Sequence, residues 1–174
     1  VQLPKGFRTE INLEAISWIK EVSQFLRKGY IITIDYGSLS SDLYHGGRST
    51  GTLLCYNKHQ KNENPYENIG DQDITSHINF SALGRWGIKY GIDYCGIIDQ
   101  TNFLRALGIK EYQNRALVNP LCRSQVKIHE TYINYGLLMA MGLKFKVLIQ
   151  QKGIKKNPLL GLKFATNSRN NFIG

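Results

Sequence analysis

Residues 12–37 read NLEAISWIKEVSQFLRKGYIITIDYG, and this stretch decides the fold class. Its first half predicts a helix over 13–28, because apolar side chains recur at helical spacing and Asn12 can cap the first turn. Gly29 marks the end of that helix. The apolar run 30–34 follows at once and predicts a strand that is apolar on both faces. A helix that leads directly into such a strand indicates a central parallel strand of an α/β sheet.

The rest of the chain continues the alternation of helices and strands. We expect strands over 52–56 and 92–98, helices from Asn79 or Ser81 to about 90 and over 100–107, and a helical stretch over 111–140 that Pro120 divides. Residues 143–149 alternate and then become apolar, which predicts a strand with one partly exposed face. The sequence therefore predicts an α/β domain over 1–152, followed by a basic, loosely ordered tail over 153–174.

The net charge of +9 on 174 residues is unevenly distributed. Residues 123–174 carry nine basic residues and one acidic residue, a net of +8, whereas residues 1–122 carry a net of +1. A nucleic-acid-binding domain usually has a basic surface that extends over the whole domain. Because the positive charge here is concentrated in the last third, the sequence does not indicate such a domain. The basic third suits a solvated tail, or alternatively a surface that binds an acidic protein or RNA.

Hydropathy and cysteine content favour a protein of a reducing compartment. No apolar run approaches the roughly 18 residues of a membrane-spanning helix, and the first residues do not resemble a signal peptide. Three widely spaced cysteines, Cys55, Cys95 and Cys122, do not form a disulfide framework. We expect a bacterial cytoplasmic protein, with the mitochondrial matrix as the alternative.

The residues Asp35, Tyr36 and Gly37 stand where the first predicted strand ends. In open α/β sheets ligands bind beyond the carboxyl ends of strands. Asp35 can accept hydrogen bonds from a cationic substrate, and Tyr36 can form an aromatic wall. Alternatively, Asp35 caps the next turn and Gly37 supplies a positive φ. The position at a strand end favours the functional interpretation.

A second candidate cluster consists of Asp73, Thr75 and His77, which alternate along the chain. In an extended segment their side chains point the same way and can orient an imidazole or bind a polar substrate. Alternatively, Asp73 and Thr75 cap backbone groups at a turn and helix entry, and spacing alone favours this second interpretation. The four histidines have no ligand-like spacing, so we expect no metal site.

The spacing of the glycines does not match that of a nucleotide-binding or methyl-donor-binding loop. Nucleotide and methyl-donor sites commonly use two glycines separated by one residue, and none of the 17 glycines here are so spaced. A part that holds the tail of a nucleotide-like cofactor is therefore not expected within these residues.

Several segments in order resemble the carboxyl-terminal half of the MidA-like S-adenosylmethionine-dependent methyltransferases, which include a mitochondrial complex I assembly factor that methylates a protein arginine. The segments that carry the resemblance span roughly residues 10–165 and include Ile34-Asp35-Tyr36-Gly37, Gly51-Thr52-Leu53, Asp73-Ile74-Thr75 with His77, Phe103-Leu104, and Phe145-Lys146-Val147-Leu148. The family's glycine-rich cofactor loop would lie upstream of Val1.

The resemblance implies a Rossmann-like class I methyltransferase sheet with a final antiparallel strand, the cofactor S-adenosylmethionine, and an arginine-containing protein substrate. It also implies that this chain alone is an inactive fragment with an exposed sheet edge that is prone to self-association. We assign Asp35 and His77 to catalysis and Tyr36, Asp73 and Thr75 to substrate binding. The competing hypothesis is a non-catalytic binding or assembly module that uses the basic third.

Overall fold

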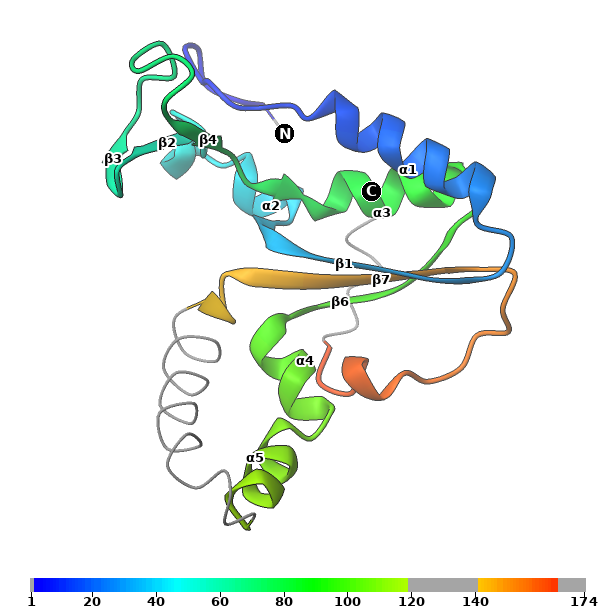
Figure 1. Cartoon of the computed structure of the whole chain (residues 1–174). Coiled ribbons are helices and arrows are strands. Elements are labelled where there is room, and N and C mark those ends of the chain that lie inside the picture. The colour runs from blue at the N-terminus through cyan, green and yellow to red at the C-terminus, as the bar shows by residue number, and fades with distance from the viewer. Residues whose placement is uncertain (1, 119–140, 166–174) are drawn as a thin grey trace.

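The main sheet has four strands in the order β5-β1-β7-β6 (Figure 1). The computed structural model describes residues 2–118 and 141–165. The four strands are β1 (Gly29–Ser38), β5 (Ile78–Asn79), β6 (Asp93–Asp99) and β7 (Phe145–Lys152). β7 runs antiparallel to both β1 and β6, and it confirms the predicted final antiparallel strand.

The predicted parallel environment of the first strand is confirmed only in part. β1 is a central strand, but its long partnership is the antiparallel one with β7, from Gly29 opposite Lys152 to Tyr36 opposite Phe145. Its parallel pairing, with β5, covers only residues 37 and 38. The apolar composition of residues 30–34 reports a sheet environment and carries no information about the direction of the neighbouring strand.

Helices lie on both faces of this sheet. α1 and α3 cover one face and α4 lies against the other, with α5 continuing beyond it (Figure 1). The helical elements are α1 (Leu13–Phe25), α2 (Ser40–Leu43), η1 (Gly46–Arg48), α3 (Phe80–Lys89), α4 (Gln100–Ala106), α5 (Ile109–Val118) and η4 (Leu160–Leu162). The predicted division of a long helix at Pro120 lies outside the described residues.

Two asparagines start the helices that cover the first face. The side-chain oxygen of Asn12 accepts a hydrogen bond from the Ala15 amide at 2.9 Å, and that of Asn79 accepts one from the Ala82 amide at 3.0 Å. Each bond satisfies an amide that has no partner within its own helix. The predicted starts of both helices are confirmed, although α1 ends three residues earlier than expected, at Phe25.

The core has two layers, one on each face of the sheet. Beneath α1 and α3 the buried cluster comprises Ile19, Ile31, Phe80, Leu83, Ile92, Ile97 and Leu148. On the other face Ile98, Val147 and Ile149 pack against Phe103 of α4 and against residues of the carboxyl-terminal segment.

β1 is not buried on both faces, contrary to the prediction. Tyr30, Ile32 and Ile34 are 40%, 54% and 47% exposed. Ile32 and Ile34 lie opposite Ile149 and Val147 and so share their face, where α4 packs on β6 and β7 and η4 packs on β6. Over residues 29–36 the side of β1 remote from β7 has no strand partner within the described chain.

The segment after β7 differs from the expected loosely ordered tail. Leu159, Leu162 and Ala165 pack against the second core layer. A Cβ atom built on Gly96 would lie 2.8 Å from the Leu162 side chain, so β6 and this segment are in close contact. Apolar side chains at these positions hold residues 159–165 against the sheet, and the remaining part of the predicted tail, 166–174, lies outside the described residues.

A small second sheet precedes α3. Its order is β3-β2-β4, from β2 (Leu54–Asn57), β3 (Gln60–Asn62) and β4 (Asp73–Thr75), all antiparallel. The strand predicted over 52–56 therefore begins two residues later, and β3 was not predicted. Lys58 and His59 adopt positive φ in the turn between β2 and β3. None of the helices in the described residues is long and apolar enough to cross a membrane.

Candidate functional site

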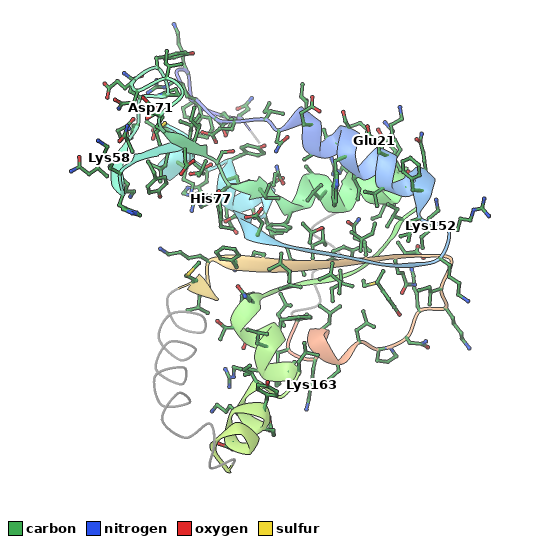
Figure 2. All side chains as sticks on the ribbon, viewed as in Figure 1. Glu21, Lys58, Asp71, His77, Lys152 and Lys163 are labelled. Carbon is green, nitrogen blue, oxygen red and sulfur yellow. The ribbon has the colours of Figure 1, made fainter. Side chains whose placement is uncertain are left out.

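A cavity with a predicted site residue in its wall lies between the amino-terminal segment and the second sheet. It has a volume of about 500 Å³ and contains His77 in its wall. The charged side chains of the wall are Arg8, Glu10, Arg48 and Glu63. Figure 2 shows His77 at the junction between the small sheet and α3, beside the carboxyl end of β1. Polar groups from distant parts of the sequence therefore converge at this cavity.

The Glu10 carboxylate organises one wall of the cavity. It accepts hydrogen bonds from the Leu53 amide at 2.8 Å, from the Thr52 amide at 2.9 Å and from the Thr52 hydroxyl at 3.0 Å. Burial raises the pKa of Glu10, but these hydrogen bonds outweigh it and leave the pKa below its usual value. Glu10 is therefore a carboxylate at neutral pH, and its hydrogen bonds hold the turn at residues 51–53.

Gly51 permits this arrangement. Its φ of +81° is favourable for glycine, and an added Cβ atom would lie 2.3 Å from a Glu10 carboxylate oxygen. The Thr52 hydroxyl, which donates to Glu10, accepts a hydrogen bond from the His77 amide at 3.0 Å. A continuous set of hydrogen bonds thus runs from Glu10 through Thr52 to the backbone of His77.

The His77 imidazole is neutral at neutral pH. Burial lowers its pKa, and the nearby positive charges of Arg48 and Lys144 lower it further, against an opposing effect of Glu10. Arg48 Nη1 lies 3.5 Å from His77 Nδ1. A guanidinium can only donate, so this contact favours the tautomer with the proton on Nε2. In that tautomer His77 is a hydrogen-bond donor at Nε2, and its Nδ1 faces a cation.

Of the residues assigned to the strand end, Tyr36 reaches His77. The two rings meet edge to face with centroids 5.9 Å apart, and the Phe145 ring makes a second edge contact with Tyr36, with centroids 5.7 Å apart. Side chains alternate along a strand, so Asp35 points to the opposite face of β1 from Tyr36. An Asp35 carboxylate oxygen accepts a hydrogen bond from the Tyr36 amide at 2.7 Å. The structure therefore brings Tyr36 and His77 together and separates Asp35 from that contact.

Gly37 has a packing role that differs from the predicted turn. Its φ is not positive, and an added Cβ atom would clash with the carbonyl oxygen of Ile78. Gly37 pairs with Ile78 in the short parallel ladder of β1 and β5. This glycine allows close approach of the two strands next to His77.

Asp73 and Thr75 lie on the strand β4, so these residues are extended, and the turn that spacing alone favoured is wrong. Asp73 is exposed, and the Thr75 hydroxyl donates to the Leu54 carbonyl at 3.2 Å on the neighbouring strand β2. Neither residue lines the cavity that contains His77. The hydrogen bond of Thr75 holds β4 to β2, which is a structural role.

A smaller cavity of about 270 Å³ lies beyond the carboxyl ends of β1 and β6. Its wall includes Asp42, Asp99 and Lys146. The Asp99 carboxylate is engaged by the amide and the side chain of Asn102 at 2.9 and 2.8 Å, and it caps α4. The larger cavity therefore has the richer set of polar groups.

Sequence reasoning missed Glu10, Arg48 and the role of Thr52. Glu10 precedes the first helix and Arg48 stands in a polar loop, so neither occupies a position that periodicity singles out. Gly51-Thr52-Leu53 was noted for its resemblance to a known family, and its function as the hydrogen-bond partner of Glu10 follows from contacts across about 40 residues of sequence.

Comparison with known proteins agrees with the methyltransferase resemblance. Residues 1–98 match a family model described as "Putative S-adenosyl-L-methionine-dependent methyltransferase". A COG1565 superfamily member from Burkholderia thailandensis bound to S-adenosyl-homocysteine has a TM-score of 0.87 and 29% identity, covering 97% of this chain and 43% of its own. A native crystal structure of a protein of that superfamily from the same organism also has a TM-score of 0.87 and 29% identity. This match covers 98% of this chain and 45% of the chain in that structure.

No curated protein matches the chain. The chain spans less than half the length of the two solved structures. The family match, however, covers more than half of the chain and includes the cavity, the turn at 51–53 and His77. The expected cofactor, S-adenosylmethionine, is the one that the family description states, and the related structure contains its demethylated product. This chain belongs to that family of S-adenosyl-L-methionine-dependent methyltransferases.

Proposed function

We propose that this chain is the substrate-side part of a class I methyltransferase that transfers a methyl group from S-adenosylmethionine to a protein arginine. The observation that carries the proposal is the family match over residues 1–98 together with the likeness to a structure that holds S-adenosyl-homocysteine. The strand order β5-β1-β7-β6, with an antiparallel β7 between β1 and β6, supports a Rossmann-like class I sheet.

The reaction requires an aligned acceptor that loses a proton. A guanidinium nitrogen attacks the methyl carbon in line with the sulfonium, the N–C bond forms, the S–C bond breaks, and S-adenosyl-homocysteine leaves. The protonated guanidinium is a poor nucleophile, so a carboxylate must orient it and accept a proton. Asp35 is the proposed carboxylate. His77 is the proposed second catalytic group and acts as a hydrogen-bond donor, because Arg48 faces its Nδ1.

The residues proposed for substrate binding are Tyr36, Asp73 and Thr75. The ring contact between Tyr36 and His77 supports a shared wall for these two residues. The exposed position of Asp73 is compatible with contact to a large protein substrate, whereas the hydrogen bond of Thr75 to Leu54 favours an indirect role. A link to the assembly of a complex I-type respiratory enzyme rests on the resemblance alone.

A chimera tests this proposal directly. Residues 10–165 replace the matching part of the Burkholderia relative, and transfer of radioactive methyl from S-adenosylmethionine to arginine-containing and lysine-containing protein acceptors is measured. We expect labelled methylarginine, and we expect Asp35→Asn and His77→Ala to lower the rate at least tenfold. Asp71→Asn, on an exposed loop, is the matched control. Unchanged rates in both site variants would refute the site assignment, and labelling confined to lysine would refute the arginine assignment.

The isolated 174-residue chain provides a second test. It spans less than half of the relative that holds S-adenosyl-homocysteine, so we expect weak or undetectable binding of S-adenosylmethionine by calorimetry. Micromolar binding by this chain alone would contradict the proposal that the cofactor is held mainly by other parts of the family fold.

The alternative function is a non-catalytic binding or assembly module. It is favoured by one observation, the net charge of +8 over residues 123–174. This hypothesis expects salt-sensitive binding of an acidic protein or RNA that disappears on deletion of residues 166–174 and neutralisation of Lys155, Lys156 and Lys163. Retention of methyl transfer by the chimera in which Lys155, Lys156 and Lys163 are neutralised would separate the two functions.

A further inference from the structure

Among the described residues, neither arginine of the large cavity has a carboxylate partner. Within residues 2–118 and 141–165 neither guanidinium lies within ion-pair distance of an acidic side chain, and the ion pair found there joins Lys156 to Asp93. The Arg8 amide donates to the Ser49 carbonyl at 2.9 Å, which places the backbone of Arg8 beside the residue that follows Arg48. Two cations thus enter one cavity from adjacent segments.

The acidic residues of the cavity do not neutralise these cations at close range. Both Glu10 carboxylate oxygens are engaged by the amides and hydroxyl of residues 52 and 53. Glu63 is an exposed residue in the wall. Arg48 is half-buried, and among the described residues its guanidinium makes one side-chain contact, with His77 Nδ1, so most of its five N–H groups remain available.

We propose that this cavity binds a carboxylate group, with Arg48 as the principal contact and Arg8 as the second. A planar guanidinium binds a carboxylate through two parallel hydrogen bonds, which Arg48 can offer from its fixed position beside His77. The turn at 51–53, held by Glu10, also lines the cavity. The inference rests on the proposed methyltransferase function for the source of the carboxylate.

Two sources supply such a group in that function. One is the carboxylate of the methionine portion of S-adenosylmethionine, and the other is an acidic side chain near the methyl acceptor of a protein substrate. The chemistry at Arg48 is the same for both. The cavity volume of about 500 Å³ accommodates either group without rearrangement of the wall.

Glutarate is the probe for the site itself, with the neutral diamide glutaramide as its control. Each is titrated into the full 174-residue chain while the backbone amide signals of Gly51, Thr52 and His77 are followed by NMR. We expect saturable shifts with glutarate, about tenfold weaker binding in Arg48→Gln and a smaller loss in Arg8→Gln. Arg105→Gln, on α4 outside the cavity, is the matched control and should bind as the original chain does.

Equal binding of glutaramide, or unchanged glutarate binding in both cavity variants, would overturn the proposal. If Arg48→Gln fails to fold, Arg8→Gln still tests it, because Arg8 is an exposed residue. These measurements require no methyl transfer, so their failure is distinguishable from failure of the proposed function.

Competition identifies the source when it is measured in a chimera in which residues 2–165 replace the matching part of the Burkholderia relative, so that the rest of the family fold is present. Displacement of glutarate by S-adenosyl-homocysteine, but not by 5′-methylthioadenosine, assigns the site to the cofactor carboxylate. Displacement by an Asp-rich peptide, but not by its Asn-substituted counterpart, assigns it to the protein substrate. Displacement by neither ligand would overturn the site's place in the proposed reaction.

Discussion

Replacement of Glu10 by Gln tests whether its charge organises the cavity wall. The carboxylate receives hydrogen bonds from two amides and one hydroxyl, at 2.8 to 3.0 Å. A glutamine has the same size and keeps one side-chain oxygen, but it removes the negative charge that strengthens the hydrogen bonds from the Thr52 and Leu53 amides. Its NH₂ group would also face the Thr52 hydroxyl. A hydrogen bond to a charged group contributes about 1 kcal/mol more than a neutral one, so the loss should be about 2 kcal/mol of unfolding free energy.

The effect should depend on pH with a defined sign. The pKa of Glu10 in the folded chain lies below its usual value of 4.5, because hydrogen bonds to the carboxylate outweigh the opposing effect of burial. The stabilisation is therefore fully present above pH 4.5 and is lost as the pH falls through the folded-state pKa. The difference between the original chain and Glu10→Gln should shrink below pH 4.5.

Urea denaturation followed by circular dichroism, at pH 7 and pH 3.5, measures both effects. The expected 2 kcal/mol corresponds to a decrease in Tm of about 4–8 °C. Glu21→Gln is the matched control, because Glu21 is exposed on α1, and its effect should stay within about 0.5 kcal/mol. A Glu10→Gln loss no larger than that of the control, or one that does not shrink in acid, would refute the reasoning.

Three further predictions concern Gly51, His77 and β1. Gly51→Ala should lower the unfolding free energy by about 2 kcal/mol in the same urea assay, because φ is +81° and the added methyl meets Glu10, and an effect below 0.5 kcal/mol would contradict this. An NMR titration of His77 should give a pKa below 6.5, and Arg48→Gln should raise it, since the Arg48 charge opposes protonation; a fall would contradict the assignment. Ile32→Lys should reduce concentration-dependent self-association measured by light scattering, because the exposed apolar side chains of β1 adjoin a strand edge that has no partner among the described residues, whereas Lys58→Gln should not.

The helix starts and the final strand were predictable because their signals are local. Asn12 and Asn79 cap helices by bonding to amides three residues later, so the pattern and the structure coincide. The alternation of residues 143–149 likewise placed β7, which begins at Phe145. The candidate site was predictable in part, since Tyr36 and His77 do meet, although Asp35 points away from that contact and Asp73 and Thr75 lie outside the cavity.

Other features depend on contacts that the sequence does not encode at short range. The antiparallel pairing of β1 with β7 joins residues more than 100 positions apart. The exposed fractions of Ile32 and Ile34 depend on which elements pack against their face of the sheet. Hydropathy shows only that the two side chains are apolar. Packing of Leu162 against Gly96 likewise brings into the core a segment whose composition resembles that of a tail.

The sequence by itself determined the helix and strand alternation, the caps, the uneven charge and the resemblance to a methyltransferase family, because these reside in the order of residue types. Only the tertiary structure decided that Glu10 engages the turn at 51–53, that Thr52 connects it to His77, and that Arg48 lies beside the imidazole. These groups come from segments 25 to 43 residues apart. Their protonation and available hydrogen bonds depend on burial and on neighbouring charges, which exist only after the chain has folded.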